Sequence, residues 1–427
     1  MTHPRRTVRY PVGVAHLGLG AFHRAHQAWY TQHAADGVGI AAFTVRSPGA
    51  AQTLADQDAL YTLVERGPEG DHLTLMQVLS EVHDGADAVS WRRTLSNPEV
   101  TVLTLTVTEA GYRENSIVPN RVLDGLRARF EANAMPLAVV SCDNLPHNGT
   151  VIRDAVLRSA DRGGTSGADD FLTWLGSSVE FVSTMVDRIT PSTTSADVEN
   201  IARQSGWRDE APVVTEPFTE WVLDGSFPAG RPQWEAAGAR FIPDVSPYER
   251  RKLWLLNAGH SLLAYHGLAR GYETIAQCMA DNALTTELER LWDEHAVVLP
   301  FDEWQIDDVR ATLRSRFVNA RIEHRLSQIG TDGSQKLRPR ILDPLCERLR
   351  VGVGPGQAQI GVLVAWIRYL ERDDVRDVAA HDLIRGLNAV SAPRDRARLV
   401  LDQLAPDRTD DLVPLLAESL STSRPFL

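Results

Sequence analysis

The sequence predicts an α/β protein with a doubly wound, mostly parallel sheet in its N-terminal part and a mostly α-helical C-terminal part. Two observations carry this prediction. Short β-rich runs alternate with helical stretches in the first half of the chain, which is typical of βαβ units and a parallel sheet. From about Pro247 onward, long helical stretches follow, with proline and glycine mainly between them. We therefore expect two domains, residues 1–240 and 241–427, with the boundary falling between residues 230 and 247.

The predicted strands come in chain order along the first domain. The first strand, Val12–Leu17, is followed by glycines and then by a helix at Phe22–Ala34. The strand Val100–Val107 is the richest in β-branched residues, which are enriched in strands. The strands are Val12–Leu17, Ile40–Val45, Val100–Val107, Leu137–Ser141 and Phe181–Val186.

The second domain shows helical periodicity almost throughout. The predicted helices are Tyr248–Ala269, Ala283–His295, Asp302–Phe317, Ile360–Arg372 and Asp382–Leu387.

Composition excludes several classes of protein. The formal net charge of -12 argues against a nucleic-acid partner, because phosphates need a basic footprint. No apolar run approaches the roughly 18 residues that span a bilayer, and the basic opening MTHPRRTVRYPVG has no apolar segment behind it. Three cysteines, Cys142, Cys278 and Cys346, lack CxxC spacing and fit reduced thiols. We expect a cytoplasmic protein without a membrane partner, either a monomer or a small homo-oligomer.

The first strand runs into a glycine turn. Gly18 and Gly20 supply the first two glycines of a GxGxxG pattern, and His23 occupies the third position. Glycines let the backbone approach a pyrophosphate, which then meets free N–H groups at the start of the next helix. The turn predicts a Rossmann-like dinucleotide site that includes Phe22. An ordinary tight strand-to-helix turn is the alternative interpretation.

The cofactor is expected to be NAD, with NADP as the other possibility. In dinucleotide folds that prefer NAD, an acid about 20 residues beyond the turn holds the ribose hydroxyls. Here the second strand ends in Phe43-Thr44-Val45-Arg46-Ser47, without an acid at its tip. Arg46 and Ser47 could accommodate a 2′-phosphate instead.

The helix after the glycine turn carries other candidate ligand residues. His23, His26 and His33 have a spacing that can bind a metal, but no cysteine or carboxylate completes the set nearby. We therefore predict no metal site. Arg24, beside the turn, is a candidate phosphate partner, and a solvated helix face is the plainer interpretation.

The segment Tyr248–Ser261 is the most informative part of the chain. At roughly 100° per residue, Glu249, Lys252, Asn257 and His260 fall within an arc of about 140° on an α-helix. Polar groups on a face shared with leucines are costly to bury unless they are paired or functional. An i,i+3 ion pair between Glu249 and Lys252 would explain these two without any chemistry.

The chemical interpretation is oxidation of a secondary alcohol. Such a reaction needs a base for the hydroxyl proton, and a lysine with a lowered pKa can be that base. The amide of Asn257 could donate to the developing alkoxide, and His260 could orient the substrate or the lysine.

With these residues in view, the sequence resembles the polyol-specific long-chain dehydrogenases, the family of mannitol 2-dehydrogenase, arabinitol dehydrogenase and the fructuronate and tagaturonate reductases. The matching stretches follow one another in order and span most of the chain. They are Gly18–Thr31, Gln57–Gly67, Thr104–Tyr112, Ser141–Gly149, Met185–Pro191, Lys252–Ser261, Arg316–Ile322 and Asp332–Pro339.

The resemblance implies roles for individual residues. Lys252 would be the general base, and Asn257 with Asn144 would form the oxyanion pocket. Asn144 follows a predicted strand, at the edge of the sheet where such folds bind ligands. The roles implied for the rest are substrate hydroxyl binding by Asp187 and His260, proton relay by Glu249, and a place beside the nicotinamide for Thr108 and Glu109. The family does not use a metal, which agrees with the lack of a zinc-ligand set in the sequence. Members of the family often carry an acid near the end of the second strand, where this chain has Arg46-Ser47.

Substrate class is left open by the sequence, with a slight preference for a polyol such as mannitol, interconverted with its ketose. A uronate or aldonate would also need a cation for its carboxylate. Arg316 is one candidate among several cations of the second domain. They are Arg316, Arg321, Arg325, Lys336, Arg338 and Arg340. Two further hypotheses are a non-catalytic dinucleotide-binding sensor and Schiff-base chemistry at Lys252.

Overall fold

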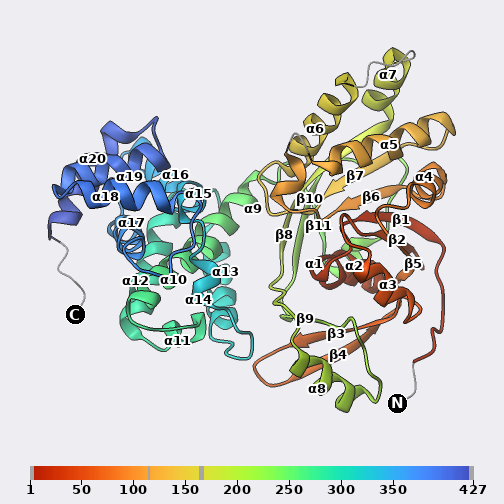
Figure 1. The fold of residues 1–427 in the computed structure, drawn as a ribbon, viewed down its shortest axis with the longest axis horizontal. Coiled ribbons are helices and arrows are strands. Elements are labelled where there is room, and N and C mark those ends of the chain that lie inside the picture. The colour runs from red at the N-terminus through yellow and green to blue at the C-terminus, as the bar shows by residue number, and fades with distance from the viewer. Residues whose placement is uncertain (1–3, 114–115, 163–167, 423–427) are drawn as a thin grey trace. The chain divides into compact units, whose positions relative to one another are not determined.

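The computed structural model describes residues 4–113, 116–162 and 168–422. By its internal contacts the chain divides into two compact units, Met1–Tyr248 (unit 1) and Glu249–Leu427 (unit 2) (Figure 1).

Unit 1 is built on an eight-stranded sheet with the order β11-β10-β8-β7-β6-β1-β2-β5. All neighbouring strands are parallel except β8 and β10, which are antiparallel. After β1 the chain builds outward on one side through β2 and β5, and then on the other side from β6. The strand order therefore reverses beside β1, the place where open α/β sheets bind ligands. The strands are β1 Val12–Leu17, β2 Gly39–Phe43, β5 Leu79–His83, β6 Val102–Leu105, β7 Leu137–Ser141, β8 Val179–Asp187, β10 Glu220–Asp224 and β11 Arg240–Phe241.

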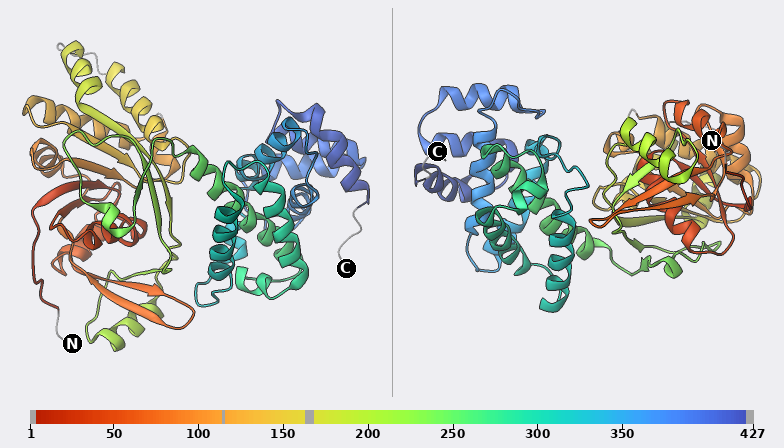
Figure 2. Two further views of the ribbon diagram at one scale, coloured as in Figure 1. Left: turned by 180° about the vertical axis from the view of Figure 1, so that it is seen from behind. Right: turned by 90° about the horizontal axis from the view of Figure 1, so that it is seen from below.

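Helices cover both faces of this sheet (Figure 2). Successive strand residues point to opposite faces, so Val14 joins the core under one set of helices and Ala15 joins the core under the other. The first set is α1 Ala21–Ala25, α2 Gln27–His33 and α3 Gly49–Ala55. The second set is α4 Ala88–Ser96, α5 Ile117–Glu131, α6 Asn148–Arg162 and α7 Ala168–Ser178. The unit is therefore doubly wound, as the sequence predicts.

A second, three-stranded sheet has the order β4-β3-β9 and is not predicted by the sequence. Its hairpin β3–β4 is antiparallel, and β9 joins β3 in parallel from far along the chain. The strands are β3 Tyr61–Arg66, β4 Asp71–Met76 and β9 Val213–Thr215, and α8 (Ser195–Ser205) precedes β9.

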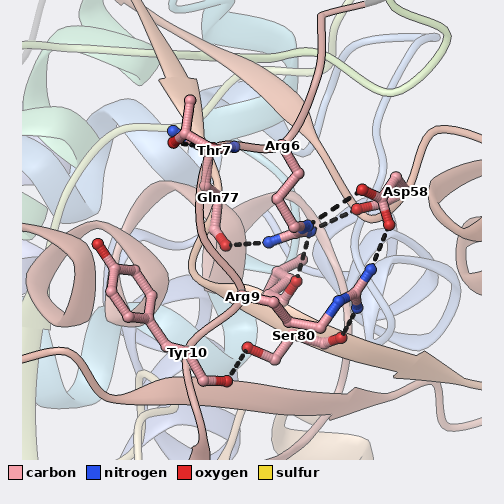
Figure 3. Close-up of polar contacts among 8 residues, drawn as sticks. Arg6, Thr7, Arg9, Tyr10, Asp58, Gln77 and Ser80 are labelled. Atoms are coloured by element: carbon pink, nitrogen blue, oxygen red, sulfur yellow. Dashed lines mark hydrogen bonds and ion pairs between the residues drawn. The ribbon is translucent and has the colours of Figure 1, made fainter.

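The basic N-terminal segment is tied along β5, the edge strand of the large sheet (Figure 3). Arg6 donates to the carbonyl of Leu79 at 2.9 Å, and the guanidinium of Arg9 donates to the carbonyl of Ser80. Asp58 pairs with both arginines. An exposed edge strand offers unpaired backbone groups to other chains, and these arginines cover part of that edge.

Unit 2 is helical and has one hydrophobic core. α10 (Ala258–Ala269) is apolar nearly all round its circumference, as expected of a helix buried among others. Towards the C-terminus, α18 (Ala380–Ala389), α19 (Pro393–Leu404) and α20 (Thr409–Thr422) add leucines to the same core. The other helices are α11 Ile275–Met279, α12 Asn282–Ala296, α13 Glu303–Phe317, α14 Leu326–Ile329, α15 Gly333–Leu337, α16 Asp343–Arg350 and α17 Gln357–Tyr369.

Two predicted helices differ in detail from the structure. The single helix expected at Phe22–Ala34 is two short helices that break at His26, whose φ and ψ of -119° and -83° are not helical. The helix expected at Tyr248–Ala269 is continuous but changes type. It begins as α9 (Ser246–Arg251), becomes a π-helix at Lys252–Asn257 (η3) and continues as α10.

Candidate functional site

The glycine turn after β1 contains one glycine that the fold requires. Gly18 has a φ of +115°, and a Cβ there would lie 2.0 Å from the carbonyl oxygen of Thr106. Its N–H and that of Leu19 both donate to the carbonyl of Phe43, at 2.8 and 2.9 Å, which joins the turn to the end of β2. At Gly20 the nearest protein atom to a Cβ would be 3.6 Å away, an ordinary contact. The protein itself therefore does not need a glycine at residue 20.

A cavity of about 390 Å³ opens beside this turn. It lies at the carboxyl ends of β1, β2 and β6, where the strand order reverses, and its size is within the usual range for small-molecule sites. The lining residues are Gly18, Leu19, Thr44, Val45, Arg46, Ser47, Ala50, Thr106, Val107, Thr108, Ala110, Gly111, Ser116, Ile117 and Val118. The glycines of the turn, and the cavity at the point where the strand order reverses, fit a dinucleotide.

The loop after β6 is held by Asp143, which lies in the motif Ser141–Gly149 but receives no role from the sequence. Its carboxylate accepts hydrogen bonds from the backbone N–H of Val107 at 3.0 Å, from that of Thr108 at 2.8 Å and from the Tyr112 hydroxyl at 2.5 Å. Thr108 has a φ of +63°, an uncommon backbone conformation for a β-branched residue. Such strain persists only where the surroundings enforce it, and the Asp143 carboxylate supplies that enforcement.

The electrostatics of this pair keep Tyr112 a proton donor. Burial raises the pKa of Tyr112 well above its usual value, and the neighbouring Asp143 carboxylate raises it further. Burial also raises the pKa of Asp143, while its hydrogen bonds from Tyr112 and the loop backbone oppose that shift.

Among the other residues predicted to bind the cofactor, Arg24 does not line the cavity. Its guanidinium donates to the carbonyl oxygens of Gly20 and Ala211, and it lies 5.3 Å from the ring centroid of Tyr61. These contacts tie the glycine turn to distant backbone, and the predicted phosphate role of Arg24 stays a prediction. Phe22 stacks on His26, and Glu109 is exposed at the start of a 3₁₀ turn between the cavity residues Thr108 and Ala110.

The two candidate substrate residues of unit 1 stand at the carboxyl ends of neighbouring strands. Asn144 is exposed in the turn after β7, and Asp187 is the buried last residue of β8. Asn148 ties the two strand ends together: its amide donates to the carbonyls of Asp143 and Thr184, each at 2.8 Å. The neighbouring Arg188 forms an ion pair with Glu65 of β3.

The histidines after the glycine turn serve packing. His23 is fully buried and stacks on His16 with 3.3 Å between ring centroids. His26 bonds the carbonyl of Glu220 at 3.0 Å, and His33 bonds that of Trp29 at 2.8 Å. Within the described residues, no group of three or more histidines, cysteines or acids is arranged to hold a metal ion.

In unit 2, the π-helical segment η3 realigns the candidate catalytic residues. On an α-helix, residues five apart are separated by about 140°. The N–H of Ala258 instead bonds the carbonyl of Leu253, five residues back. This i→i+5 pattern is characteristic of π-helices, which occur frequently at functional sites. The wider turn brings Lys252 and Asn257 closer to one face of the helix than the α-helical separation of about 140° would.

Neighbouring side chains stabilise the widened turn. Trp292 donates to the carbonyl of Leu255 at 2.9 Å, and His295 bonds the carbonyl of Trp254 at 2.6 Å. The Trp254 indole donates at 3.1 Å to the carbonyl of Pro339, which lies in a second π-helical segment, Arg338–Leu342 (η4). Each π-helical segment thus stabilises the other.

Asn257 and His260 keep polar groups available for a ligand. The side-chain amide of the buried Asn257 has no hydrogen-bond partner within the described residues. The same holds for Nε2 of His260, whose ring stacks on Phe317 at 4.7 Å. Unpaired buried polar groups are costly, and functional sites are one of the places where they persist.

The surroundings of His260 are cationic. Burial lowers its pKa well below the usual value, and the positive charges of His324, Arg316, Arg340 and Lys252 lower it further. Arg340 donates to Oγ of Ser261 at 3.2 Å. Arg316, the arginine predicted to bind substrate, is therefore close enough to lower the pKa of the His260 imidazole.

Comparison with known proteins assigns the chain to a family. Residues 12–236 match the family model of the mannitol dehydrogenase Rossmann domain, and residues 244–397 match that of the mannitol dehydrogenase C-terminal domain. The chain belongs to the mannitol dehydrogenase family. The resemblance seen in the sequence motifs is thereby confirmed. Within the described residues, no helix has both the length and the apolar character needed to cross a membrane.

Members of this family with known names are oxidoreductases. D-mannonate oxidoreductase of Escherichia coli is 36% identical, over 84% of this chain and 80% of the relative. A mannitol 2-dehydrogenase of Pyrenophora tritici-repentis is 31% identical, over 95% of this chain and 78% of the relative. The structure of Pseudomonas fluorescens mannitol 2-dehydrogenase in ternary complex with NAD and D-mannitol is 30% identical, with a TM-score of 0.80, and covers 97% of this chain and 92% of that one. The family and this fold support the predicted architecture, a Rossmann-like unit followed by a helical one.

Proposed function

We propose that this chain is a nicotinamide-dependent oxidoreductase that interconverts a linear polyol, or a related sugar acid, with its ketose, with Lys252 as general base. The observation that supports the proposal is the π-helical segment Lys252–Asn257, whose wider turn brings its two end residues closer to one face of the helix. The cofactor class is supported by the cavity at the switch point and by the NAD in the P. fluorescens complex.

The use of lysine at residue 252 supports a role that arginine cannot fill. Of the 44 lysines and arginines in the chain, only Lys252 and Lys336 are lysines. Arginine stays protonated at any physiological pH, whereas lysine can lose its proton in a suitable environment. A chain that otherwise uses arginine for its cations has a chemical reason to keep a lysine here.

In the proposed reaction, the substrate hydroxyl gives its proton to Nζ of Lys252 as the carbon becomes a carbonyl. A bound nicotinamide would accept the hydride. The Asn257 amide, which has no other hydrogen-bond partner within the described residues, would donate to the oxygen as negative charge develops on it. Asn144 would contribute to the same oxyanion contact, Asp187 and His260 would hold other hydroxyls, and Glu249 would relay the proton from the lysine.

The cationic surroundings of His260 favour a sugar acid as a second, narrower candidate. Arg316 and Arg340 both act on the imidazole together with Lys252. Arginine binds carboxylates in bidentate geometry, so arginines close to the candidate site suit the carboxylate of a sugar acid. The similarity to D-mannonate oxidoreductase points the same way.

The test is the absorbance of reduced nicotinamide, with NADH and NADPH each paired with fructose, xylulose, fructuronate and tagaturonate. We expect oxidation with at least one ketose. Preference for fructuronate or tagaturonate would select the sugar-acid candidate, and preference for fructose or xylulose would select a polyol. No oxidation across the panel, with dinucleotide binding intact, would favour a non-catalytic sensor. Covalent trapping of a ketose on Lys252 by borohydride would favour Schiff-base chemistry.

A further inference from the structure

The tip of β2 forms one wall of the dinucleotide cavity. Phe43, the last residue of β2, pairs in register with Leu17 of β1, and its carbonyl accepts the N–H groups of Gly18 and Leu19. The residues that follow β2 are therefore fixed beside the glycine turn. In dinucleotide-binding folds this tip meets the adenosine ribose, and its side chains discriminate a 2′-hydroxyl from a 2′-phosphate.

The side chains at this tip suit a phosphate and not a ribose diol. None of the described residues that line the cavity is acidic. Arg46 lines it and is exposed, and its guanidinium has no partner within the described part of the chain. Ser47 is also exposed, and its hydroxyl accepts only a long 3.5 Å contact from the N–H of Gly49.

On the strand that pairs with β2, the acid next to this tip is Asp84, which directly follows β5. It does not line the cavity. One of its oxygens, Oδ1, accepts the N–H of Ala86 at 3.0 Å and lies 3.5 Å from the Thr44 hydroxyl. This carboxylate is thus engaged in the turn after β5, and the acid that would hold ribose hydroxyls is missing from the tip of β2.

We infer that Arg46 and Ser47 form a subsite for the 2′-phosphate of NADP(H). The inference rests on the proposed function, because it concerns the same dinucleotide cavity. The planar guanidinium can donate two parallel hydrogen bonds to phosphate oxygens, and the Ser47 hydroxyl can donate a third. NAD(H) lacks this phosphate, so Arg46 and Ser47 should not add to its binding affinity.

The test is calorimetric titration of the full chain with NADP⁺ and NAD⁺, repeated with adenosine 2′,5′-bisphosphate and 5′-AMP. The Arg46→Ala variant should lose affinity for NADP⁺ by on the order of 10- to 100-fold, the usual effect of a hydrogen-bonded charge. Its affinity for NAD⁺ should be unchanged. Arg46→Asp should reverse the preference, because an acid at this position can accept the ribose hydroxyls.

Two control variants show whether the effect belongs to Arg46 itself. Arg203→Ala removes an exposed arginine of the same unit that does not line the cavity, and it should leave both affinities unchanged. Asp84→Asn should also leave NAD⁺ affinity unchanged. If Arg46→Ala leaves the ratio of the two affinities unaltered, or if Asp84→Asn abolishes NAD⁺ binding, the subsite is overturned while the proposed function stands. If the wild-type chain binds neither dinucleotide, the proposed function is overturned as well.

Discussion

The glycine turn shows, at the level of single residues, how a structural requirement differs from a ligand's requirement. Gly18 is fixed by its φ of +115° and by the carbonyl of Thr106, whereas Gly20 has free space for a methyl group. We expect Gly20→Ala to fold with the stability of the wild type but to bind dinucleotide at least about ten-fold more weakly, because the new Cβ keeps the backbone from the pyrophosphate. Gly18→Ala should fail to fold normally.

Thermal unfolding and dinucleotide titration of these variants check that prediction. Gly176→Ala is the matched control, because a Cβ there, in the last turn of α7, meets no atom within 4 Å. Alanine has a higher helix propensity than glycine, so this variant should be at least as stable as the wild type and should bind dinucleotide normally. Wild-type affinity in Gly20→Ala would show that the turn does not face the pyrophosphate.

Lys252 gives the second prediction at this scale. Lys252→Ala should lower turnover by about 10²- to 10⁴-fold, the typical contribution of a general base, with dinucleotide affinity unchanged. Lys252→Arg keeps the positive charge but cannot accept a proton, so it should be equally inactive. Steady-state kinetics and titration measure the two effects. Arg290→Ala, which removes an exposed arginine of unit 2 outside the candidate site, should retain turnover. Substantial activity in Lys252→Arg would show that Lys252 is not the general base and contributes only its positive charge.

Among the elements, the paired π-helical segments control where Lys252 and Asn257 lie. The Trp254 indole links η3 to η4 through the carbonyl of Pro339. Trp254→Phe keeps most of the packing but leaves that carbonyl without this donor. We expect unit 2 to lose about 1 kcal/mol of stability, and kcat to fall more than dinucleotide affinity. Urea unfolding and steady-state kinetics would measure both. An unchanged kcat at reduced stability would limit Trp254 to a role in folding.

Local sequence patterns predict the elements whose partners are close in sequence. β1 and β7 have the predicted ends, and the alternation of strands and helices gives the doubly wound sheet. The sheet β4-β3-β9 was not predicted because β3 pairs with a three-residue strand about 150 residues away, and a short strand has no periodicity of its own. The π-helical segment was not predicted because one extra residue per turn hardly disturbs an apolar pattern with a 3.6-residue period.

The residues of the candidate site, too, were predicted where the signal is local in sequence and missed where the partner is distant. The glycine turn, Arg46 and Thr108 could be placed at the cavity from the sequence, because each directly follows a strand that a β-rich run predicts. The predicted roles of Lys252, Asn257 and His260 stay predictions. Asp143 was not predicted because its function is to hold backbone N–H groups from a loop about 35 residues away. The contact of Arg24 with the carbonyl of Ala211 could not be predicted, because the two residues are 187 positions apart.

Across the whole molecule, each unit carries fully buried histidines whose neutrality ties stability to pH. Burial lowers the pKa of His16 to about 3, that of His295 to about 4, and that of His23 well below its usual value. His16 lies between the hydroxyls of Thr104 and Thr106, and His295 is bonded to a backbone carbonyl in unit 2. All three are completely shielded from solvent.

The sign of the effect follows from proton binding. An unfolded histidine has a pKa of about 6.5, so between that value and the lower folded pKa the unfolded chain binds more protons than the folded chain. Stability is therefore complete above about pH 6.5 and falls as the pH drops, by up to about 1.4 kcal/mol per pH unit for each such histidine. The window extends to about pH 4 for His295 and to about pH 3 for His16.

Urea midpoints measured at pH 7.5, 6 and 5 would test this coupling. The midpoint should fall on acidification, and His16→Gln, which can keep hydrogen bonds to both threonines, should fall less steeply than the wild type. Comparing the two slopes cancels the contributions of all other titrating groups. His33→Gln, an exposed histidine of the same unit, should match the wild-type slope. Identical slopes in His16→Gln and the wild type would mean that His16 takes up no extra proton on unfolding and does not contribute to the acid sensitivity of unit 1.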